Sequence, residues 1–334
     1  MKKWSFLIWF LSFSSMLFAQ NPQWLEFQTP VKASLRGLSP VSDQVCWASG
    51  SGGKFLLTMD GGNTWKSGTI GGLDTVDFRS IHALSEDVAV AASAGQPAVI
   101  YRTEDGGDSW KKVHQEGEAA FFDAIFFVNP TNGYLLGDPV DGKWMILETV
   151  DGGKSWHALS KLPSAMEGEA AFAASSSSLI ADAQTVSFAT GGSVARLHQF
   201  SLSSNTWIVK NLSAIAQSDP AKGVFAMTKV DGKMVLVGGD YTQLDNREGN
   251  SLLIGEYSDR VPKEVPHGYR SGIAYLERNG ILVAVGPSGS DFSKDSGNSW
   301  TKFSTTGYHA VKVSNDGKSI WASGSQGRIG KILE

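Results

Sequence analysis

The sequence predicts an all-β fold, a seven-bladed β-propeller, and two recurring patterns predict it. An eight-residue phrase, called the box below, occurs at 58–65, 103–110, 149–156 and 293–300, with Asp third, Gly fifth and Trp eighth. A second pattern, an apolar strand ending in a small residue, occurs seven times and ends at Gly50, Ser93, Gly137, Gly191, Gly238, Gly286 and Gly324. Repeats spaced by about 45 residues are typical of propellers, and seven strand endings indicate seven blades.

Short apolar segments fill the space between the boxes. In the first repeat, segments 43–48 and 54–57 flank Gly50 and precede the box. Segments of about five residues bounded by Gly, Asn, Asp or Ser are typical of strands, and four per repeat make one blade. Two boxes have decayed: 202–207 keeps Trp207 but has Leu202 at the Asp position, and 257–259 keeps only a turn.

The two ends of the chain are expected to meet in one blade. The last repeat stops at Leu333, before its box, whereas residues 21–27 resemble the strand that follows a box. We therefore expect residues 24–27 to supply the outer strand of the last blade. This closes the ring and removes an open sheet edge that would favour aggregation.

Residues 1–19 have the pattern of a secretory signal peptide. Two lysines precede an apolar run over 4–18, and Ala19 ends it as a small residue suited to cleavage. The run is too short for a comfortable membrane span, so no membrane insertion is expected after cleavage. The sequence thus predicts an exported protein, periplasmic or extracellular, with a single propeller domain over 20–334.

Composition narrows the function. The formal charge of −4 becomes −6 once the two lysines of the leader are removed, and an acidic chain lacks the basic surface that DNA or RNA binding requires. Cys46 is the only cysteine, so no internal disulfide can form. We expect a monomer held together by its core.

The box residues are predicted to be structural. An Asp at the start of a turn accepts backbone N–H bonds, a Gly takes positive φ, and a Trp packs as a large apolar group. This role is assigned to Asp60, Trp65, Asp105, Trp110, Asp151, Trp156, Asp295 and Trp300. The box lacks the ligand series of a calcium loop, the six histidines are scattered, and no phosphate loop precedes a helix. No metal and no cofactor is expected, and the serines at 175–178 fit a blade edge or turn.

A binding site is expected where the inner strands begin, because equivalent positions of different blades converge around the axis. When the expected inner strands are aligned on the apolar residues near their start, the first residue of the strand is Arg, Asp or His. The loops that follow the strands ending in a small residue add further polar residues to the same face. The predicted axial site consists of Arg36, Arg79, Asp123, Asp138, Glu169, Asp240, Tyr241, Arg270, Ser288 and His309.

Two interpretations of this cluster remain open. The arginines could pair with Asp123, Glu169 and Asp240 and close the channel with ion pairs. Alternatively, the guanidinium groups could bind a carboxylate, on a small ligand or on the chain terminus of a partner, because Arg presents a planar fork of N–H donors.

The box residues resemble those of the Asp-box, or bacterial neuraminidase repeat, propellers. Within these, the chain looks most like the photosystem II stability/assembly factor-like proteins, over nearly the whole mature chain. The resemblance implies a non-enzymatic scaffold that assembles or stabilises a membrane complex by binding a protein partner, such as a subunit of that complex, across its Arg-bearing face.

The alternative is a glycan-binding or glycan-cleaving propeller that uses the same face. Sialidases bind the substrate carboxylate with an Arg triad and use a Tyr–Glu pair and an Asp. Here Arg36, Arg79 and Arg270 would form the triad, with Tyr241 or Tyr269 as the nucleophile, although the Arg-Ile-Pro continuation expected after Arg36 is absent.

Overall fold

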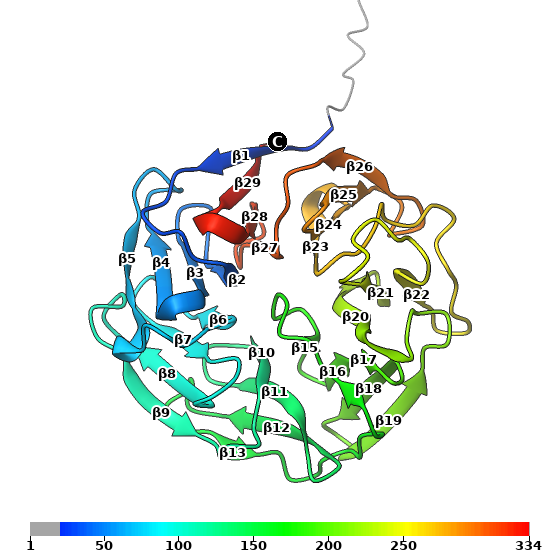
Figure 1. The fold of residues 1–334 in the computed structure, drawn as a ribbon, viewed down its shortest axis with the longest axis horizontal. Coiled ribbons are helices and arrows are strands. Elements are labelled where there is room, and N and C mark those ends of the chain that lie inside the picture. Colours follow the sequence, from blue (N-terminus) through cyan, green and yellow to red (C-terminus); the bar gives the residue numbers. More distant parts are fainter. Residues whose placement is uncertain (1–20, 334) are drawn as a thin grey trace, which may run out of the picture.

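The computed structural model describes residues 21–333, which form seven antiparallel sheets arranged around a central axis (Figure 1). The predicted seven-bladed propeller is therefore confirmed. The predicted leader over 1–19 lies outside the described residues. No helix within 21–333 has the length and apolar character needed to cross a bilayer.

Blades 1 to 3 are regular four-stranded meanders that begin with the strand nearest the axis. Blade 1 contains β2 (Leu35–Pro40), β3 (Cys46–Gly50), β4 (Lys54–Thr58) and β5 (Lys66–Thr69). Blade 2 contains β6 (Ser80–Ala83), β7 (Ala89–Ala92), β8 (Val99–Thr103) and β9 (Lys111–Gln115). Blade 3 contains β10 (Phe122–Phe127), β11 (Gly133–Val140), β12 (Lys143–Thr149) and β13 (His157–Ala158). Short 3-10 turns, η1 (Ser51–Gly53) and η2 (Ile70–Gly72), follow β3 and β5.

Blades 4 and 6 have the same four-stranded order. Blade 4 contains β15 (Leu179–Ala181), β16 (Thr185–Ala189), β18 (Arg196–Ser201) and β19 (Thr206–Asn211). Blade 6 contains β23 (Gly272–Leu276), β24 (Ile281–Gly286), β25 (Gly289–Ser293) and β26 (Thr301–Ser304), with η3 (Glu277–Asn279) between its first two strands.

Blade 5 departs from the predicted four strands. Its meander consists of β20 (Asp219–Val230), β21 (Lys233–Asp240) and β22 (Ser251–Ile254), and the two-residue strands β14 (Glu169–Ala170) and β17 (Gly191–Gly192) extend the sheet beside β20. The position of the fourth strand is held only by a single bridge between Leu253 and Arg260. This blade carries the box that decayed to a turn, and without the box hairpin nothing fixes the register of a full outer strand.

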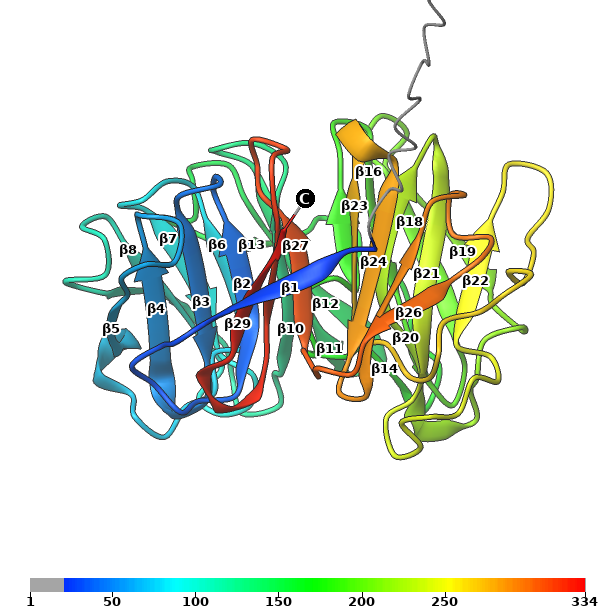
Figure 2. The ribbon, with the colours of Figure 1, turned by 90° about the horizontal axis from the view of Figure 1, so that it is seen from above.

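The two ends of the chain close the ring, as predicted. Blade 7 contains β27 (Ala310–Val313), β28 (Ile320–Ser323), β29 (Ile329–Leu333) and β1 (Gln23–Phe27), with η4 (Ser325–Gly327) before β29. Trp24 pairs with Ile332, its ring lies 4.8 Å from that of Tyr308, and its Nε1–H donates to Ser290 Oγ at 3.0 Å. Figure 2 shows β1 lying across the outer wall beside β29.

Each box forms a tight hairpin turn. In the first box, Asp60 Oδ1 accepts the backbone N–H of Thr64 at 2.9 Å, Asp60 Oδ2 accepts its hydroxyl at 2.6 Å, and Thr58 Oγ1 accepts the N–H of Gly62. Gly61 and Gly62 have φ of 71° and 97°, a region that disfavours side chains. These bonds to the carboxylate lower the pKa of Asp60, and the equivalent contacts hold the pKa of Asp105 and Asp151 at about 2.

The box tryptophans pack against the preceding blade. Trp110 of blade 2 lies edge-on to Trp47 of blade 1 at 6.1 Å, and Trp65 of blade 1 lies edge-on to Trp321 of blade 7 at 6.4 Å. Trp300 of blade 6 packs with Val235 of blade 5. The core of the protein is therefore a series of apolar layers between blades, with box tryptophans in four of them.

The segment 173–178, called the plug below, occupies the axis. Figure 1 shows this loop reaching the centre of the ring just before β15. Ser176 Oγ lies 2.5 Å from Ser80 Oγ of blade 2, Ser175 Oγ donates to the carbonyl of Ser271 of blade 6, and Ser177 accepts the N–H of Met227 of blade 5. The four serines are buried. Of the two predicted roles, blade edge or turn, the segment adopts the turn, and its serines contact several blades instead of extending one sheet.

Candidate functional site

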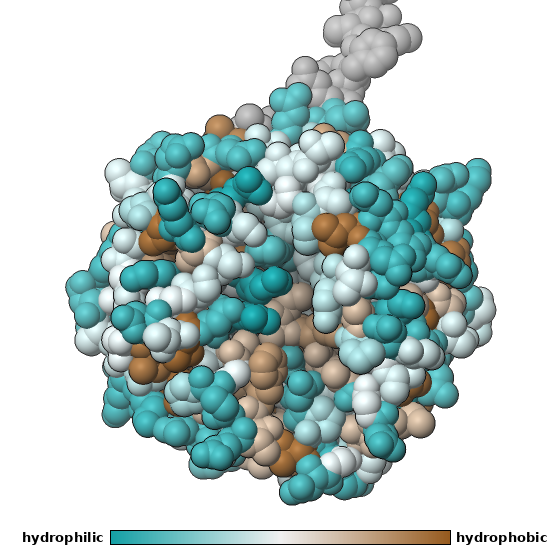
Figure 3. Space-filling model, in the orientation of Figure 1, coloured by the Kyte–Doolittle hydropathy of each residue, from teal (hydrophilic) through white to brown (hydrophobic). Residues whose placement is uncertain are grey.

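A cavity of about 420 Å³ lies at the axial mouth where the inner strands begin. We call it the arginine cavity. Figure 3, which shows this face, has a hollow at the centre of the ring, with hydrophilic side chains on one side and apolar ones on the other. The lining residues are Arg36, Arg79, Phe121, Asp138, Ala171, Phe172, Ala173, Ala174, Pro220, Phe225, Tyr241, Tyr269, Ser271, Pro287 and His309.

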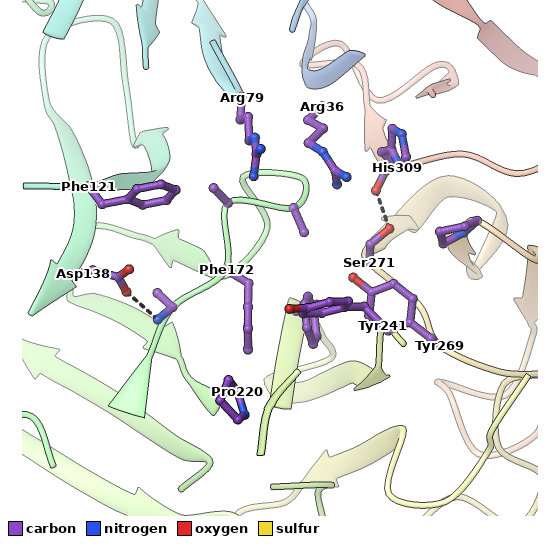
Figure 4. A pocket seen from close by; sticks show the side chains of 15 residues that line it. Arg36, Arg79, Phe121, Asp138, Phe172, Pro220, Tyr241, Tyr269, Ser271 and His309 are labelled. Carbon is purple, nitrogen blue, oxygen red and sulfur yellow. Dashed lines mark hydrogen bonds between the residues drawn. The ribbon is translucent and has the colours of Figure 1, made fainter. Parts of the chain in front are cut away.

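Arg36 is directed into the cavity by a β-bulge. The register of β2 against β3 shifts between Leu35 and Gly37, so that Arg36 is the extra residue. Figure 4 shows Arg36 and Arg79 pointing into the cavity side by side. Within residues 21–333, no hydrogen bond or ion pair engages the Arg36 guanidinium. Burial and the neighbouring charge of Arg79 lower the pKa of Arg36.

Arg79 is the second cation of the cavity, and it is only partly neutralised. Its Nε donates to Asp77 Oδ2 at 2.7 Å, and its side chain is 36% exposed. The terminal N–H groups of the guanidinium are not used in this ion pair. The two arginines therefore leave several charge-bearing donors available on one wall.

His309 completes this wall without adding charge. Its Nε2 lies 2.9 Å from Ser325 Oγ and 3.3 Å from Ser34 Oγ. Burial, together with the charges of Arg36 and Arg79, lowers the pKa of His309 to about 3. The ring is therefore neutral at physiological pH and contributes a polar edge.

The facing wall is aromatic. The rings of Phe172 and Phe225 stack with centroids 3.8 Å apart, and Tyr269 meets Phe225 edge-on at 4.7 Å. Tyr241, 48% exposed, stands at the rim 6.1 Å from Phe225. An apolar group can thus lie against this wall while its anionic end reaches the arginines.

Asp138 is the only carboxylate among the described residues that line the cavity. Its Oδ1 accepts the N–H of Ala171 at 3.0 Å, and burial raises its pKa. Asp123, predicted to line the site, is instead buried beneath it. It is the bulged residue of β10, its carboxyl has no hydrogen-bond partner, and burial and the charge of Asp138 raise its pKa well above the usual range.

Arg270 does not line the cavity. Its guanidinium is buried, with NH2 2.5 Å from Asp291 and Nε donating to the same carboxylate at 2.7 Å. The neighbouring Ser271 lines the cavity in its place. The side chains of consecutive residues in an extended chain point to opposite sides. The alignment of blade 6 was off by one residue, so it placed Arg270 in the cavity wall instead of Ser271. Ser288, also predicted, accepts a bond from Arg270 and stays outside the cavity lining.

Glu169 and Asp240 also lie outside the lining. Glu169 is held by Arg196, by His198 Nε2 at 3.0 Å and by the hydroxyl of Thr190 at 2.7 Å, and these bonds hold its pKa at about 2. Asp240 accepts the N–H and the hydroxyl of Thr242. Of the two open interpretations, the one in which the axial arginines pair with Asp123, Glu169 and Asp240 is therefore wrong.

The structure brings together five of the ten predicted residues, Arg36, Arg79, Asp138, Tyr241 and His309. Sequence reasoning missed the two phenylalanines of the aromatic wall, Phe172 and Phe225. Phe225 had a detectable signal, because Phe225-Ala-Met repeats the pattern of Arg36-Gly-Leu and Asp123-Ala-Ile, a bulged residue followed by a small and an apolar one. The Lys222-Gly-Val alignment used for blade 5 is three residues too early.

The geometry does not form the catalytic arrangement expected of a sialidase. Arg270 is committed to Asp291, so Arg36 and Arg79 have no third arginine beside them in the cavity lining. Glu169, the one glutamate among the predicted site residues, is bound to Arg196 and His198. Within residues 21–333 no group of three or more His, Cys, Asp or Glu side chains is placed to hold a metal ion.

Comparisons with known proteins agree with this architecture. Residues 17–119 match the family model described as Photosynthesis system II assembly factor YCF48. No curated protein matches the sequence. A solved structure described as YCF48 bound to D1 peptide superimposes with a TM-score of 0.66 at 16% identity, covering 95% of this chain and 96% of the other.

Two further structures show the same fold. YCF48 from Cyanidioschyzon merolae superimposes with a TM-score of 0.63 at 16% identity, covering 92% of this chain and 98% of the other. U3-55K gives 0.66 at 11% identity, covering 94% and 100%. Over residues 17–119 the chain matches the sequence model of the YCF48 assembly factors, and as a whole it is a seven-bladed β-propeller that resembles them in fold.

Proposed function

We propose that this chain is an exported, non-enzymatic scaffold that binds a peptide segment of a protein partner in the arginine cavity, as an assembly factor would. The observation that carries the proposal is the unpaired guanidinium of Arg36 beside Arg79, facing the stacked rings of Phe172 and Phe225. A carboxylate that meets two guanidinium groups forms charge-assisted hydrogen bonds, which are the strong ones.

The chemistry favours a peptide that has a carboxylate next to an apolar side chain. The carboxylate would accept N–H bonds from Arg36 and Arg79, and the side chain would pack on the aromatic wall. A chain terminus or an acidic residue supplies such a carboxylate. The solved relative described as YCF48 bound to D1 peptide supports a peptide ligand, and the family match supports a subunit of a membrane complex as the source.

The test uses an array of short peptides that end in Phe, Leu, Ala or Gly, each with a free and an amidated C-terminus. Binding is measured by fluorescence anisotropy on the wild type, on Arg36→Ala and on Arg260→Ala, an exposed arginine with the same charge change. We expect free-carboxylate peptides ending in Phe or Leu to bind best, and Arg36→Ala alone to lose them. Equal binding by the wild type and Arg36→Ala would reject the arginine cavity as the site.

A glycan-cleaving function is the competing hypothesis, and the same variants distinguish it. Turnover of a panel of aryl glycosides that disappears in Arg36→Ala would replace the scaffold proposal with a hydrolase. Export is tested separately by fractionating cells that express the full chain with a C-terminal tag. We expect a product cleaved after Ala19 outside the cytoplasm, and an uncleaved cytoplasmic product would contradict export.

A further inference from the structure

A second cavity, of about 430 Å³, lies at the opposite mouth of the axial channel. We call it the lysine cavity. Four of the inner strands that begin at the arginine cavity, β2, β6, β10 and β27, end here, and β27 follows His309 and brings Lys312 to the second mouth. Its wall is apolar, formed chiefly by Leu38, Ile81, Ile125, Phe126, Phe127 and Val313.

The plug separates the two cavities. Ala173 and Ala174 line the arginine cavity, whereas Ser176 lines the lysine cavity. The short contact between Ser176 and Ser80, together with the bond from Ser175 to Ser271, holds the plug across the axis. A ligand in one cavity therefore does not reach the other.

Lys312 is the one charged side chain at neutral pH among the described residues that line this cavity. Its Nζ donates to the carbonyl of Ser176 at 3.1 Å. An ammonium group has three donors, so two remain without a protein acceptor among the described residues. His82, the other titratable group in the wall, packs 5.0 Å from Phe127, and burial and the charge of Lys312 lower its pKa to about 3, so it is neutral.

An unbalanced ammonium in an apolar wall is costly for the folded protein, because burial disfavours the charged form. This desolvation lowers the pKa of Lys312 to about 8, so most of the group still carries its charge at pH 7. An apolar residue at this position would fill the space without this desolvation cost. An anion that arrives with its own apolar body would both neutralise the ammonium and fill the cavity.

We propose that the lysine cavity binds a small monocarboxylate with an aliphatic or aromatic body, whose carboxylate accepts N–H bonds from Lys312 Nζ while its body packs on Ile81, Ile125 and Phe127. The volume lies within the range of small-molecule pockets, and one polar group in an apolar wall is their usual composition. This proposal is independent of peptide binding at the arginine cavity.

The first experiment is calorimetric titration of the wild type, Lys312→Met and Lys111→Met with octanoate and with octanol. Lys111 is an exposed lysine of β9, so its variant controls for net charge. We expect octanoate to bind the wild type and Lys111→Met, and its affinity to fall about tenfold or more in Lys312→Met. Octanol should bind the wild type more weakly than octanoate. Equal octanoate affinity in Lys312→Met and the wild type would overturn the proposal.

Two further measurements remove the remaining ambiguities. Octanoate binding that persists in Arg36→Ala excludes the arginine cavity as its site, whereas loss of binding there would overturn the proposal. Reductive methylation of the wild type, read by mass spectrometry, requires no variant to fold. Octanoate should protect Lys312 and leave Lys111 reactive. Unchanged labelling of Lys312 at saturating octanoate would overturn the proposal.

Discussion

The two mouths of the axial channel share four inner strands, β2, β6, β10 and β27, yet they carry different chemistry. Three inner strands are bulged near the arginine cavity, at Arg36, Asp123 and Phe225, whereas β2 and β10 pair without a register shift where they line the lysine cavity. A bulge removes a residue from the regular alternation and re-aims its side chain. At the lysine cavity the side chains follow the alternation, and the wall is mainly apolar.

The comparison indicates how one propeller carries two cavities whose residues can change independently of each other. Arg36 enters the first mouth at a bulge, where the ladder is already interrupted, and Arg79 enters it just before β6 begins, so neither disturbs the packing between blades. The second mouth lies on the side of the box turns, since box residues Gly61, Gly106 and Gly152 donate to the loops that follow the inner strands. Changes near the boxes should therefore affect stability and the lysine cavity, and changes of Arg36 and Arg79 should affect binding at the arginine cavity with little effect on stability.

The largest effect is expected for Trp156→Ala. Trp156 is 4% exposed and meets Phe127, a wall residue of the lysine cavity, edge-on at 5.9 Å. Truncating a buried Trp costs about 3–5 kcal/mol, which urea denaturation will measure. Peptide affinity at the arginine cavity, measured well below the unfolding transition, should change by less than about twofold. A folded variant that has lost peptide binding would show that the two mouths are coupled.

The next largest effect is expected for Arg79→Ala, whose peptide affinity is compared with that of a double variant. Removing Arg79 takes away one cation and also leaves the Asp77 carboxylate beside Arg36 without its partner. Losing a charged hydrogen bond costs about 1.5–3 kcal/mol, so peptide affinity should fall about tenfold or more.

In the double variant Asp77→Asn/Arg79→Ala the repelling charge is gone, so part of the affinity should return in the same anisotropy assay. Stability should change little in either variant, because this ion pair is partly exposed and such pairs contribute at most about 1 kcal/mol. A double variant no better than the single one would mean that Asp77 does not act on the bound carboxylate.

A smaller effect is expected for Tyr241→Ala. The ring is half-exposed at the rim, so its removal should leave the urea midpoint unchanged and lower the affinity for peptides ending in Phe or Leu several-fold, about 1 kcal/mol. Peptides ending in Gly should be unaffected, because they offer nothing to pack on the ring. An equal loss for both peptide classes would place the apolar side chain elsewhere.

The fold was predictable because the patterns that specify it are local. An Asp, a Gly of positive φ and a Trp at fixed spacing specify one hairpin, and the closing strand was visible as an unmatched segment at 21–27. The site was only half predictable. Arg36 and Arg79 follow from the position of the inner strands, but the packing of Phe172 on Phe225 joins residues 53 positions apart and has no local signal.

The plug and the lysine cavity were beyond the sequence for the same reason. The serines at 175–178 make contacts with blades 2, 5 and 6, and these contacts exist only once the ring has closed. Lys312 follows the alternation of an ordinary strand, so nothing in the segment 310–313 distinguishes it from a solvated lysine. Arg270 shows how sensitive the prediction was to alignment. An error of one residue was enough to replace a side chain that lines the cavity with one that lies in a buried ion pair.

The subtlest expected effect is the pH dependence given by Asp123, which lies beneath the arginine cavity. Burial raises the pKa of Asp123 well above its usual range, so the folded protein keeps this carboxyl protonated at pH values where the unfolded chain, with a pKa near 4, has already lost the proton. The folded state then binds more protons than the unfolded state, and wild-type stability falls as pH rises above about 4 until the folded pKa is passed.

Asp123→Asn stays neutral and removes this dependence. In thermal melts, the melting temperature of Asp123→Asn relative to the wild type should therefore increase as pH rises from 4 to 8. Asp87→Asn, at an exposed position, is the control. A variant that gains most at pH 4 would mean that Asp123 is ionised in the folded protein and that its charge is balanced by Arg79.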